Sequence, residues 1–254
     1  MTITETEAGS RRRAAPAVEA RGLTKVYGQG DAKVYALREV DVTFETGAFT
    51  AIMGPSGSGK STLMHCLAGL DTATSGTVRV GDVELTGLSD KRLTLLRRER
   101  IGFVFQAFNL LPTLTAEQNI RLPLEIAARQ ADQVLFDRVV ETVGLRDRLG
   151  HRPAELSGGQ QQRVAVARAL ISKPQVIFAD EPTGNLDSRS GAEVLSFLRA
   201  SVRELGQTIV MVTHDPVAAA HADRVIFLRD GELVTELTAP TPQSVLDTLM
   251  KLEG

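Results

Sequence analysis

Residues 54–61 read Gly54-Pro55-Ser56-Gly57-Ser58-Gly59-Lys60-Ser61, which fits the pattern G-x-x-x-x-G-K-[S/T]. The loop follows an apolar run, Phe49 to Met53, and leads into a helical pattern from Thr62 to Leu70. Glycines permit backbone angles that turn several N–H groups toward one point, and the start of a helix adds its positive dipole end. A glycine turn with an incidental lysine is the alternative. The order strand, loop, helix predicts an anion site on an α/β fold.

The members of this loop have separate expected roles. Lys60 is expected to bind the β- and γ-phosphates of a nucleotide, and the Ser61 hydroxyl to ligate Mg²⁺. The other nucleotide-binding candidates surround the phosphates: Gly54, Pro55, Ser56, Gly57, Ser58, Gly59 and Thr62.

Apolar runs without polar alternation predict a mostly parallel sheet, because its strands are buried on both faces. Three such runs occur, at Phe49–Met53, Val176–Ala179 and Thr208–Val212. Two other segments, Val40–Phe44 and Val78–Leu85, alternate with period two and predict half-buried antiparallel strands. Helical patterns separate the apolar runs. The expected class is therefore α/β, with a P-loop NTPase core, an antiparallel β subdomain and a helical subdomain.

The helical segments carry start signals. Capping boxes are expected at Thr115…Gln118, opening a helix to about Arg129 with a kink at Pro123, and at Ser190…Glu193, opening a helix to Leu205. Residues 92–165 contain no strand other than Gly102–Phe105 and are expected to form the helical subdomain. The other helices are expected at 132–143, at 164–171 and near the C-terminus, where an amphipathic helix docks through Val245, Leu246, Leu249, Met250 and Leu252.

Composition and charge exclude several classes of protein. The 254 residues carry a net charge of −2 with acids and bases interspersed, so no basic field argues for a nucleic-acid partner. The single cysteine, Cys66, excludes an internal disulfide and is expected to be a buried, inert thiol. No apolar run reaches the roughly 18 residues that span a bilayer, and Met1–Ser10 is too polar for a signal peptide. We expect a disordered tail at 1–17, a folded domain at 18–254, and a cytoplasmic chain whose membrane role is exercised through a partner.

Two carboxylates and a histidine follow apolar runs directly. Asp180 and Glu181 stand at the carboxyl end of a predicted parallel strand, where open α/β sheets bind ligands. Adjacent side chains point in different directions. Asp180 is therefore expected to hold Mg²⁺, mostly through water, and Glu181 to polarise an attacking water as general base. His214 follows the third run in the same way and is a candidate γ-phosphate contact. An ordinary loop before Pro182 and a solvated histidine are the alternatives.

A second glycine-containing stretch, Glu155 to Arg163, reads ELSGGQQQR. Ser157 and Gln160 fit the S-x-x-Q capping box that opens many helices. A helix start with two glycines also leaves exposed N–H groups and a positive dipole end. The stretch is expected to be a helix cap and is also a candidate half of an anion site.

With these residues placed, the chain over about residues 19–235 resembles the ATP-binding cassette (ABC) transporter ATPases. Leu156–Gln160 is identical to the signature sequence of that family. Gln106 matches the loop glutamine that touches Mg²⁺ and the attacking water, and Gly184–Asp187 matches the loop that crosses to the sister subunit. Tyr27 matches the aromatic residue that stacks on adenine, and Tyr35 is the alternative because its surroundings repeat the same local pattern.

The resemblance implies an ATPase that uses ATP and Mg²⁺ and works as a head-to-tail homodimer. The half-site that one chain offers to the phosphate loop of its partner would consist of Ser157, Gly158, Gly159 and Gln160, with Asp187 in the crossing loop. The implied catalytic residues are Lys60, Gln106, Glu181 and His214, and the implied metal ligands are Ser61, Gln106 and Asp180. A GTPase is not expected, because the sequence has no N-K-x-D guanine-specificity motif.

Within the family, Phe105–Ala116, Asp180–Asp187 and the extension Gln29–Lys33 are similar to the lipoprotein-releasing and macrolide-efflux branch. That branch implies a peripheral subunit at the cytoplasmic face of the inner or plasma membrane. The subunit would bind an integral permease and would not itself insert into the membrane. Two alternatives are a mechanotransmitter that regulates cell-envelope enzymes without moving a substrate, and a soluble ABC protein that acts on DNA or ribosomes.

The permease is expected to dock a cytoplasmic helix in a groove near Phe108, Leu111 and Leu114. The alternative is that these apolar residues are core of the helical subdomain.

Overall fold

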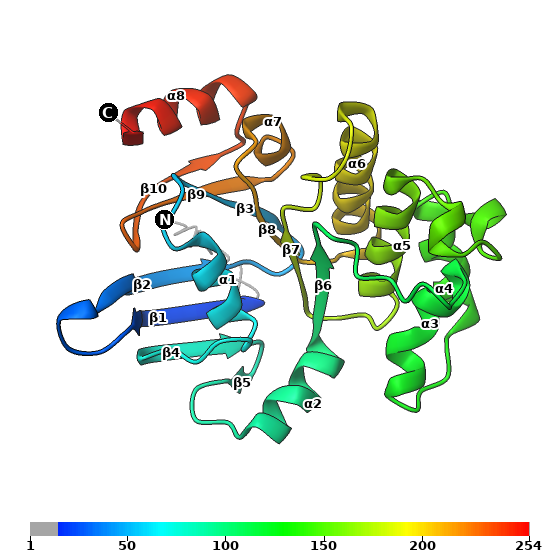
Figure 1. Cartoon of the computed structure of the whole chain (residues 1–254), viewed down its shortest axis with the longest axis horizontal. Coiled ribbons are helices and arrows are strands. Elements are labelled where there is room, and N and C mark those ends of the chain that lie inside the picture. Colours follow the sequence, from blue (N-terminus) through cyan, green and yellow to red (C-terminus); the bar gives the residue numbers. More distant parts are fainter. Residues whose placement is uncertain (1–14, 254) are drawn as a thin grey trace, which may run out of the picture.

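A computed structural model describes residues 15–253 and contains two β-sheets with helices packed around them (Figure 1). The larger sheet has the strand order β10-β9-β3-β8-β7-β6. Its strands are β3 (Phe49–Met53), β6 (Ile101–Phe105), β7 (Val176–Asp180), β8 (Ile209–Val212), β9 (Arg224–Arg229) and β10 (Glu232–Thr238). All neighbours pair in parallel except β10, which pairs antiparallel with β9 at the edge. The predicted mostly parallel core is confirmed.

The smaller sheet is antiparallel and has the order β2-β1-β4-β5. Its strands are β1 (Val18–Tyr27), β2 (Val34–Phe44), β4 (Ser75–Val80) and β5 (Val83–Glu84). The prediction of one strand over Val78–Leu85 is wrong, because the chain reverses at Gly81 and Asp82 and Val80 pairs with Val83. Gly81 has a φ of +58°, a conformation that glycine adopts without strain, and this allows the tight turn.

The larger sheet is buried on both faces, as the absence of polar alternation predicts. Successive side chains of a strand point to opposite faces. In β3, Ile52 joins the apolar cluster under the antiparallel sheet, whereas Ala51 and Met53 join the cluster under the helices on the other side. In β7, Phe178 and Ile177 divide in the same way. The parallel sheet is therefore the middle layer of the molecule.

Eight α-helices and three 3₁₀ turns complete the described part of the chain. The α-helices are α1 (Lys60–Leu67), α2 (Asp90–Arg100), α3 (Ala116–Ile126), α4 (Gln133–Thr142), α5 (Gly158–Leu170), α6 (Ser188–Leu205), α7 (Pro216–Ala219) and α8 (Pro242–Glu253). The 3₁₀ turns are η1 (Gly30–Ala32), η2 (Arg146–Arg148) and η3 (Pro153–Glu155). Helices α3 to α6 lie together beyond the β6–β7 side of the large sheet, while α1 lies beside the antiparallel sheet (Figure 1).

Of the helix starts predicted at Thr115 and Ser190, the first is confirmed and the second is wrong. The Thr115 hydroxyl accepts from the Gln118 backbone N–H, and the Gln118 side chain accepts from the Thr115 backbone N–H. These two bonds make the predicted capping box. The helix behind it ends at Ile126 and contains Pro123. Helix α6 begins at Ser188, two residues before the predicted capping residue Ser190. Its N-cap is Asp187, whose carboxylate accepts a hydrogen bond from the Ser190 backbone N–H. Ser190 therefore lies in the first turn of the helix and is not its cap.

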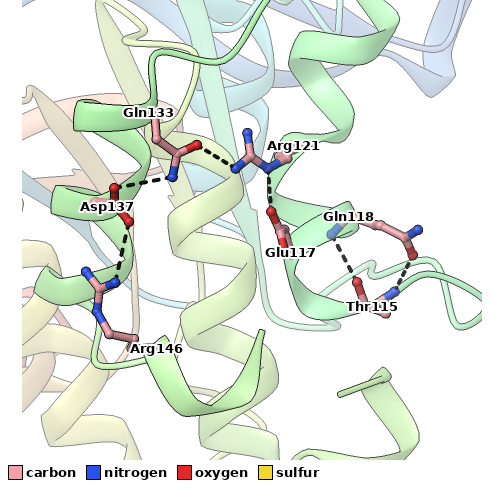
Figure 2. Close-up of polar contacts among 7 residues, drawn as sticks. All are labelled: Thr115, Glu117, Gln118, Arg121, Gln133, Asp137 and Arg146. Atoms are coloured by element: carbon pink, nitrogen blue, oxygen red, sulfur yellow. Dashed lines mark hydrogen bonds and ion pairs between the residues drawn. The ribbon is translucent and has the colours of Figure 1, made fainter. Parts of the chain in front are cut away.

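Polar side chains link α3 to α4 in a single chain of contacts (Figure 2). Arg121 donates to Glu117 at 2.8 Å and to Gln133 at 3.1 Å, and Gln133 donates to Asp137 at 3.2 Å. The Arg121 guanidinium also lies 3.9 Å from the ring centroid of Phe136. Exposed pairs of this kind each contribute about 0–1 kcal/mol, so apolar packing carries most of the stability here.

The predicted helical subdomain, 92–165, includes a strand of the main sheet. Strand β6 pairs along its whole length with β7, so residues 101–105 belong to the parallel core. The segment before it is α2, and the helices after it are α3, α4 and the start of α5. The division of the chain into subdomains stays a prediction.

Both ends of the described chain are anchored. Of the predicted tail at 1–17, residues 1–14 lie outside the described residues, whereas Ala17 is buried and its N–H donates to the Phe44 carbonyl at 2.8 Å. The predicted C-terminal helix is confirmed as α8, with Val245 buried in the core. Leu246 and Met250 are exposed, so two of the five residues that were expected to dock face away from the core.

Candidate functional site

The loop at Gly54–Ser61 connects β3 to α1 at the carboxyl end of the parallel strands. Gly54, Gly57 and Gly59 have positive φ angles of 146°, 78° and 100°. A Cβ on Gly54 would collide with the carbonyl of Leu228, and one on Gly59 with the carbonyl of Ala36. Glycine is therefore required on two counts, conformation and close approach of neighbouring backbone.

Lys60 is folded over this loop. Its ammonium donates to the carbonyls of Gly54 at 2.9 Å and Pro55 at 2.7 Å, so the charge lies against the loop backbone. Burial lowers the pKa of Lys60, and the nearby carboxylate of Glu181 opposes that shift. Lys60 and Glu181 thus act on each other electrostatically although they are far apart in sequence.

Asp180 and Glu181 stand at the carboxyl end of β7, as predicted. Burial raises the pKa of Asp180, and the charge of His65 on α1 works against this shift. Glu181 has a φ of +46°, which turns its side chain away from the direction of the strand. Its carboxylate Oε1 lies 2.9 Å from Nδ1 of His214, and its backbone N–H donates to the Val212 carbonyl. The structure therefore brings the predicted base and the predicted histidine together.

The candidate metal ligands are a hydroxyl, a carboxylate and an amide oxygen, from Ser61, Asp180 and Gln106. These are the hard oxygen donors that Mg²⁺ prefers. Among residues 15–253 no group of three or more His, Cys, Asp or Glu side chains is arranged to hold a metal. A site with one carboxylate still fits Mg²⁺, because this ion keeps several waters and binds phosphate oxygens.

Gln106 is held by the segment after β7. Its Nε2 donates to Oδ1 of Asn185 at 2.9 Å, and Asn185 Nδ2 donates to the Gln106 backbone carbonyl at 3.0 Å. A Cβ on Gly184 would come within 2.8 Å of Gln106 Nε2, so the side chain lies directly on this glycine. The predicted metal-contacting glutamine and the predicted crossing loop are therefore in contact.

The stretch Ser157–Gln160 forms the predicted capping box at the start of α5. Ser157 Oγ accepts from the Gln160 backbone at 3.3 Å, and Gln160 Oε1 accepts from the Ser157 backbone at 2.9 Å. Gly159 packs on Ser190, where a Cβ would come within 2.9 Å of the serine Cβ. Within the described chain no hydrogen bond joins 157–160 to the phosphate loop. The two glycine-containing stretches are separate features of one chain.

Tyr27 and Tyr35, the two candidates for the stacking aromatic, lie on neighbouring strands. Tyr35 pairs with Val26 across β1 and β2, so it lies on the side of the sheet opposite to Tyr27. The Tyr27 hydroxyl donates to Asp71 Oδ2 at 2.6 Å, in the loop after α1. The guanidinium carbon of Arg38 lies over the ring of Tyr35, 4.6 Å from the ring centroid. Tyr27 is thus the one of the two whose hydroxyl is bonded to the loop following the phosphate-loop helix.

Comparison with known proteins gives the family. The model of the ABC transporter family matches residues 37–184. MJ1508, an ABC transporter ATP-binding protein of Methanocaldococcus jannaschii, is 48% identical over 219 residues, which cover 85% of this chain and 97% of that relative. The chain belongs to the ABC transporter family. It is an ATP-binding cassette, the ATP-hydrolysing component of these transporters.

Further relatives of the cassette include longer proteins and solved dimers. The macrolide export ATP-binding/permease protein MacB of Neisseria meningitidis serogroup B is 45% identical over 228 residues, which cover 89% of this chain and only 35% of that relative. The cassette therefore spans about a third of the length of the MacB relatives it matches. The dimeric, post-hydrolysis structure of the cassette MJ0796, bound to ADP and Pi, is similar with a TM-score of 0.76 and 42% identity, and covers 88% of this chain and 99% of its own.

Three further residues support the site of the cassette and were not singled out from the sequence: Asp71, Gln162 and Asn185. Gln162 is fully buried, and its Nε2 donates to the carbonyls of Phe105 at 3.2 Å and Pro182 at 2.6 Å. It joins the segment before Gln106 to the segment after Glu181. The sequence offered a weak signal for it, since a polar residue lies on the apolar face of α5. It offered none for Asp71, and Asn185 was placed only as a member of the predicted crossing loop, because its partner is distant in sequence.

The cassette has an apolar cavity of about 620 Å³ between α2, β6, α3 and α5. Phe103, Phe105, Pro123 and Ile126 line it, with arginines at its border. The residues expected to form a docking groove, Phe108, Leu111 and Leu114, are not among its lining residues. Asn109, next to Phe108, does line it, whereas Phe108 lies near Gly158. The docking groove near Phe108, Leu111 and Leu114 stays a prediction.

No helix within residues 15–253 of the cassette has the length and apolar character needed to cross a bilayer.

Proposed function

We propose that the cassette hydrolyses ATP as one half of a two-fold dimer and drives an integral membrane permease that exports or extracts an apolar or lipid-linked substrate. The observation that carries this proposal is the separation of the phosphate loop from Ser157–Gln160 within the chain. Each stretch offers backbone N–H groups to an anion, and neither completes the other. A head-to-tail two-fold arrangement pairs the two stretches twice.

Hydrolysis requires a water between Glu181 and the γ-phosphorus. Glu181 accepts the proton of this water as the water oxygen forms a bond to phosphorus and the bond to the ADP oxygen breaks. Lys60, the N–H groups of the phosphate loop and His214 then stabilise the charge on the γ-phosphoryl oxygens. Bound Mg²⁺ would be held by Ser61, Gln106 and Asp180, and would neutralise phosphate charge. Glu181 contacts His214 at 2.9 Å, which supports a shared role of the two groups at one substrate position.

The permease would dock in the cavity between α2, β6, α3 and α5. Its walls are mostly apolar, and Arg97, Arg98 and Arg168 contribute positive charge. A short amphipathic helix with an acidic end has the matching chemistry. The cavity touches Phe105, next to Gln106, so a docked helix would sense the loop that contacts the nucleotide. The cassette would then be a peripheral subunit at the cytoplasmic face of the membrane.

A subunit-mixing experiment tests the composite site. Lys60→Ala removes the phosphate loop function and Ser157→Arg blocks the half-site offered to the partner, so each variant alone is inactive. When the two are mixed in equal amounts, half of the dimers hold one intact site, and about a quarter of the wild-type rate is expected from the two-fold symmetry.

The matched control mixes Lys60→Ala with Glu181→Gln. Both residues belong to the same side of a composite site, so neither site of the mixed dimer is intact and no activity should return. The proposed arrangement is refuted if both mixtures recover ATPase activity equally. It is also refuted if the mixture of Lys60→Ala with Ser157→Arg recovers none although the mixed dimer forms.

A further inference from the structure

The side chain of Tyr27 is held in place although the residue is 43% exposed. Its hydroxyl donates to Asp71 Oδ2 at 2.6 Å, and the ammonium of Lys25 lies 4.7 Å from the centroid of its ring. An exposed tyrosine would otherwise turn freely about two side-chain torsions. The ring is therefore fixed at one end by a hydrogen bond and covered on one face by a cation, while the residue keeps much of its surface exposed.

Asp71 is itself fixed from several directions. Its Oδ1 accepts from Lys25 Nζ at 2.6 Å and from the Thr72 backbone N–H at 2.7 Å. Lys25 also donates to the Thr72 carbonyl at 2.7 Å, and its side chain is only 11% exposed. The hydrogen bonds from Lys25 and Tyr27 outweigh the effect of burial and lower the pKa of Asp71, so the carboxylate is ionised. The acceptor for the tyrosine is thus charged and immobile.

The position of Asp71 connects this cluster to the phosphate loop. Helix α1 begins in the phosphate loop at Lys60 and ends at Leu67, and Asp71 follows it after a short turn. The Asp71 backbone N–H donates to the carbonyl of His65 in that helix. Tyr27 ends β1, so the hydrogen bond from its hydroxyl joins the antiparallel sheet to the loop after α1. The ring is therefore linked to the phosphate loop through one hydrogen bond and the helix that begins in that loop.

We propose that Asp71 and Lys25 are positioning residues, which hold the Tyr27 ring in the orientation at which it stacks on the base of the nucleotide. The inference rests on the proposed role of Tyr27 as the stacking residue. A ring that is already ordered loses less side-chain entropy when a ligand binds. Because the contact is to the base alone, the cluster strengthens binding of nucleotides and leaves binding of a bare polyphosphate unchanged.

Titration calorimetry of the full chain with Mg·ATP and with inorganic tripolyphosphate tests this. Asp71→Ala removes the acceptor and Tyr27→Phe removes the donor while keeping the ring. Each is expected to weaken ATP binding about three- to tenfold, the range for ordering one side chain, without weakening tripolyphosphate binding. The double variant should be no weaker than the weaker single variant, since both substitutions remove the same contact.

The matched control is Asp82→Ala, which removes an exposed carboxylate paired with Arg100 at the β4–β5 turn. It should leave both affinities unchanged. If Asp71→Ala does not fold, Tyr27→Phe alone decides.

Three results would overturn the inference. The first is an unchanged ATP affinity in the variants while wild type prefers ATP to tripolyphosphate, and the second is an equal loss of affinity for both ligands. The third is a wild type that binds both ligands equally, which would also remove the stacking role of Tyr27. The first two results overturn only the positioning role of Asp71 and Lys25, so the failure of either role can be told from the failure of the other.

Discussion

Glu181 combines two features that an ordinary loop residue lacks. Its backbone has a φ of +46°, and its carboxylate contacts His214 while acting electrostatically on Lys60. Non-glycine residues with positive φ are uncommon, and they persist where the surrounding structure fixes them. Here the backbone bond from Glu181 to Val212 supplies that constraint. The geometry directs the carboxylate toward the phosphate loop rather than into solvent.

Glu181→Gln is expected to abolish turnover while leaving ATP binding intact. Glutamine has nearly the same shape but cannot accept the proton of the attacking water, so the rate should fall about 10²- to 10⁴-fold, the usual contribution of a general base. Phosphate release and ATP affinity, measured on the same preparation, check the two halves of the prediction. A variant with the wild-type rate would remove Glu181 from the mechanism.

At neutral pH, Asp180 is expected to lower the stability of the fold, because its ionised carboxylate is partly buried. Burial raises its pKa, so the folded protein binds this proton more tightly than the unfolded chain does. The contribution of Asp180 to stability is therefore full below the ordinary aspartate pKa of about 4, and is lost as pH rises through the higher folded pKa.

Asp180→Asn stays neutral at every pH and should remove this loss. We expect a Tm near neutral pH that is higher than that of the wild type, and no difference below the ordinary aspartate pKa. Thermal melts of both proteins from acidic to neutral pH give the comparison. An equal pH dependence of Tm in the variant and wild type would contradict the prediction.

At the scale of elements, Gln162 is the connection between the two loops that carry Gln106 and Glu181. Its buried amide donates to carbonyls on both sides. Replacing it with alanine removes both bonds, and the Phe105 carbonyl keeps its bond from the Phe108 N–H at 3.3 Å. Gln162→Ala should therefore lower the free energy of unfolding by roughly 2–4 kcal/mol, from two lost hydrogen bonds and the space left behind. Urea denaturation measures this as a lower midpoint at unchanged slope.

Gln161→Ala is the control for Gln162→Ala. Gln161 is adjacent in sequence and partly exposed, and its single side-chain bond is to the Leu156 carbonyl at 3.1 Å. We expect a loss below about 1 kcal/mol, typical of one such bond. Equal losses in the two variants would show that Gln162 is no special connection.

The predictable elements were those whose pattern is local. Buried parallel strands have continuous apolar runs, and the caps at Thr115 and Ser157 pair with residues three positions away. Strand β1 escaped detection because it is irregular: its pairing register shifts at several points, which breaks the period-two alternation. The strand over Val78–Leu85 was assigned too long because a two-residue turn preserves the alternation on both of its sides. Strand β10 was not predicted either, although its exposed and half-buried positions alternate with the period of a strand.

The same distinction holds for the site. The phosphate loop, Glu181 and His214 can be proposed from motifs and from their positions after apolar runs. Asp71 and Asn185 cannot, because their roles follow from contacts with Tyr27 and Gln106 over long separations in sequence. Such contacts become visible only when the strands are paired and the loops at their ends are brought together.

For the molecule as a whole, the arrangement of layers places the nucleotide face and the proposed partner face on connected elements. Strand β6 ends next to Gln106, and Phe103 and Phe105 of the same strand line the apolar cavity. The rings of Phe103 and Phe105 stack with centroids 5.5 Å apart. We therefore expect a movement of Gln106 to be passed to the cavity wall through this short, packed strand.

Ile126 is the exposed apolar residue that best tests the partner face, since it lines this cavity and is 62% exposed. Ile126→Glu places a charge on an apolar wall, so it should prevent docking of a helix while leaving the phosphate loop untouched. We expect more than a tenfold loss of co-purification with the proposed integral membrane permease, corresponding to about 1.4 kcal/mol or more. ATP hydrolysis by the cassette alone should be unchanged.

Val134→Glu is the matched control, because Val134 is 74% exposed on α4 and does not line the cavity. Loss of co-purification in both variants, or in neither, would place the permease on another surface of the cassette.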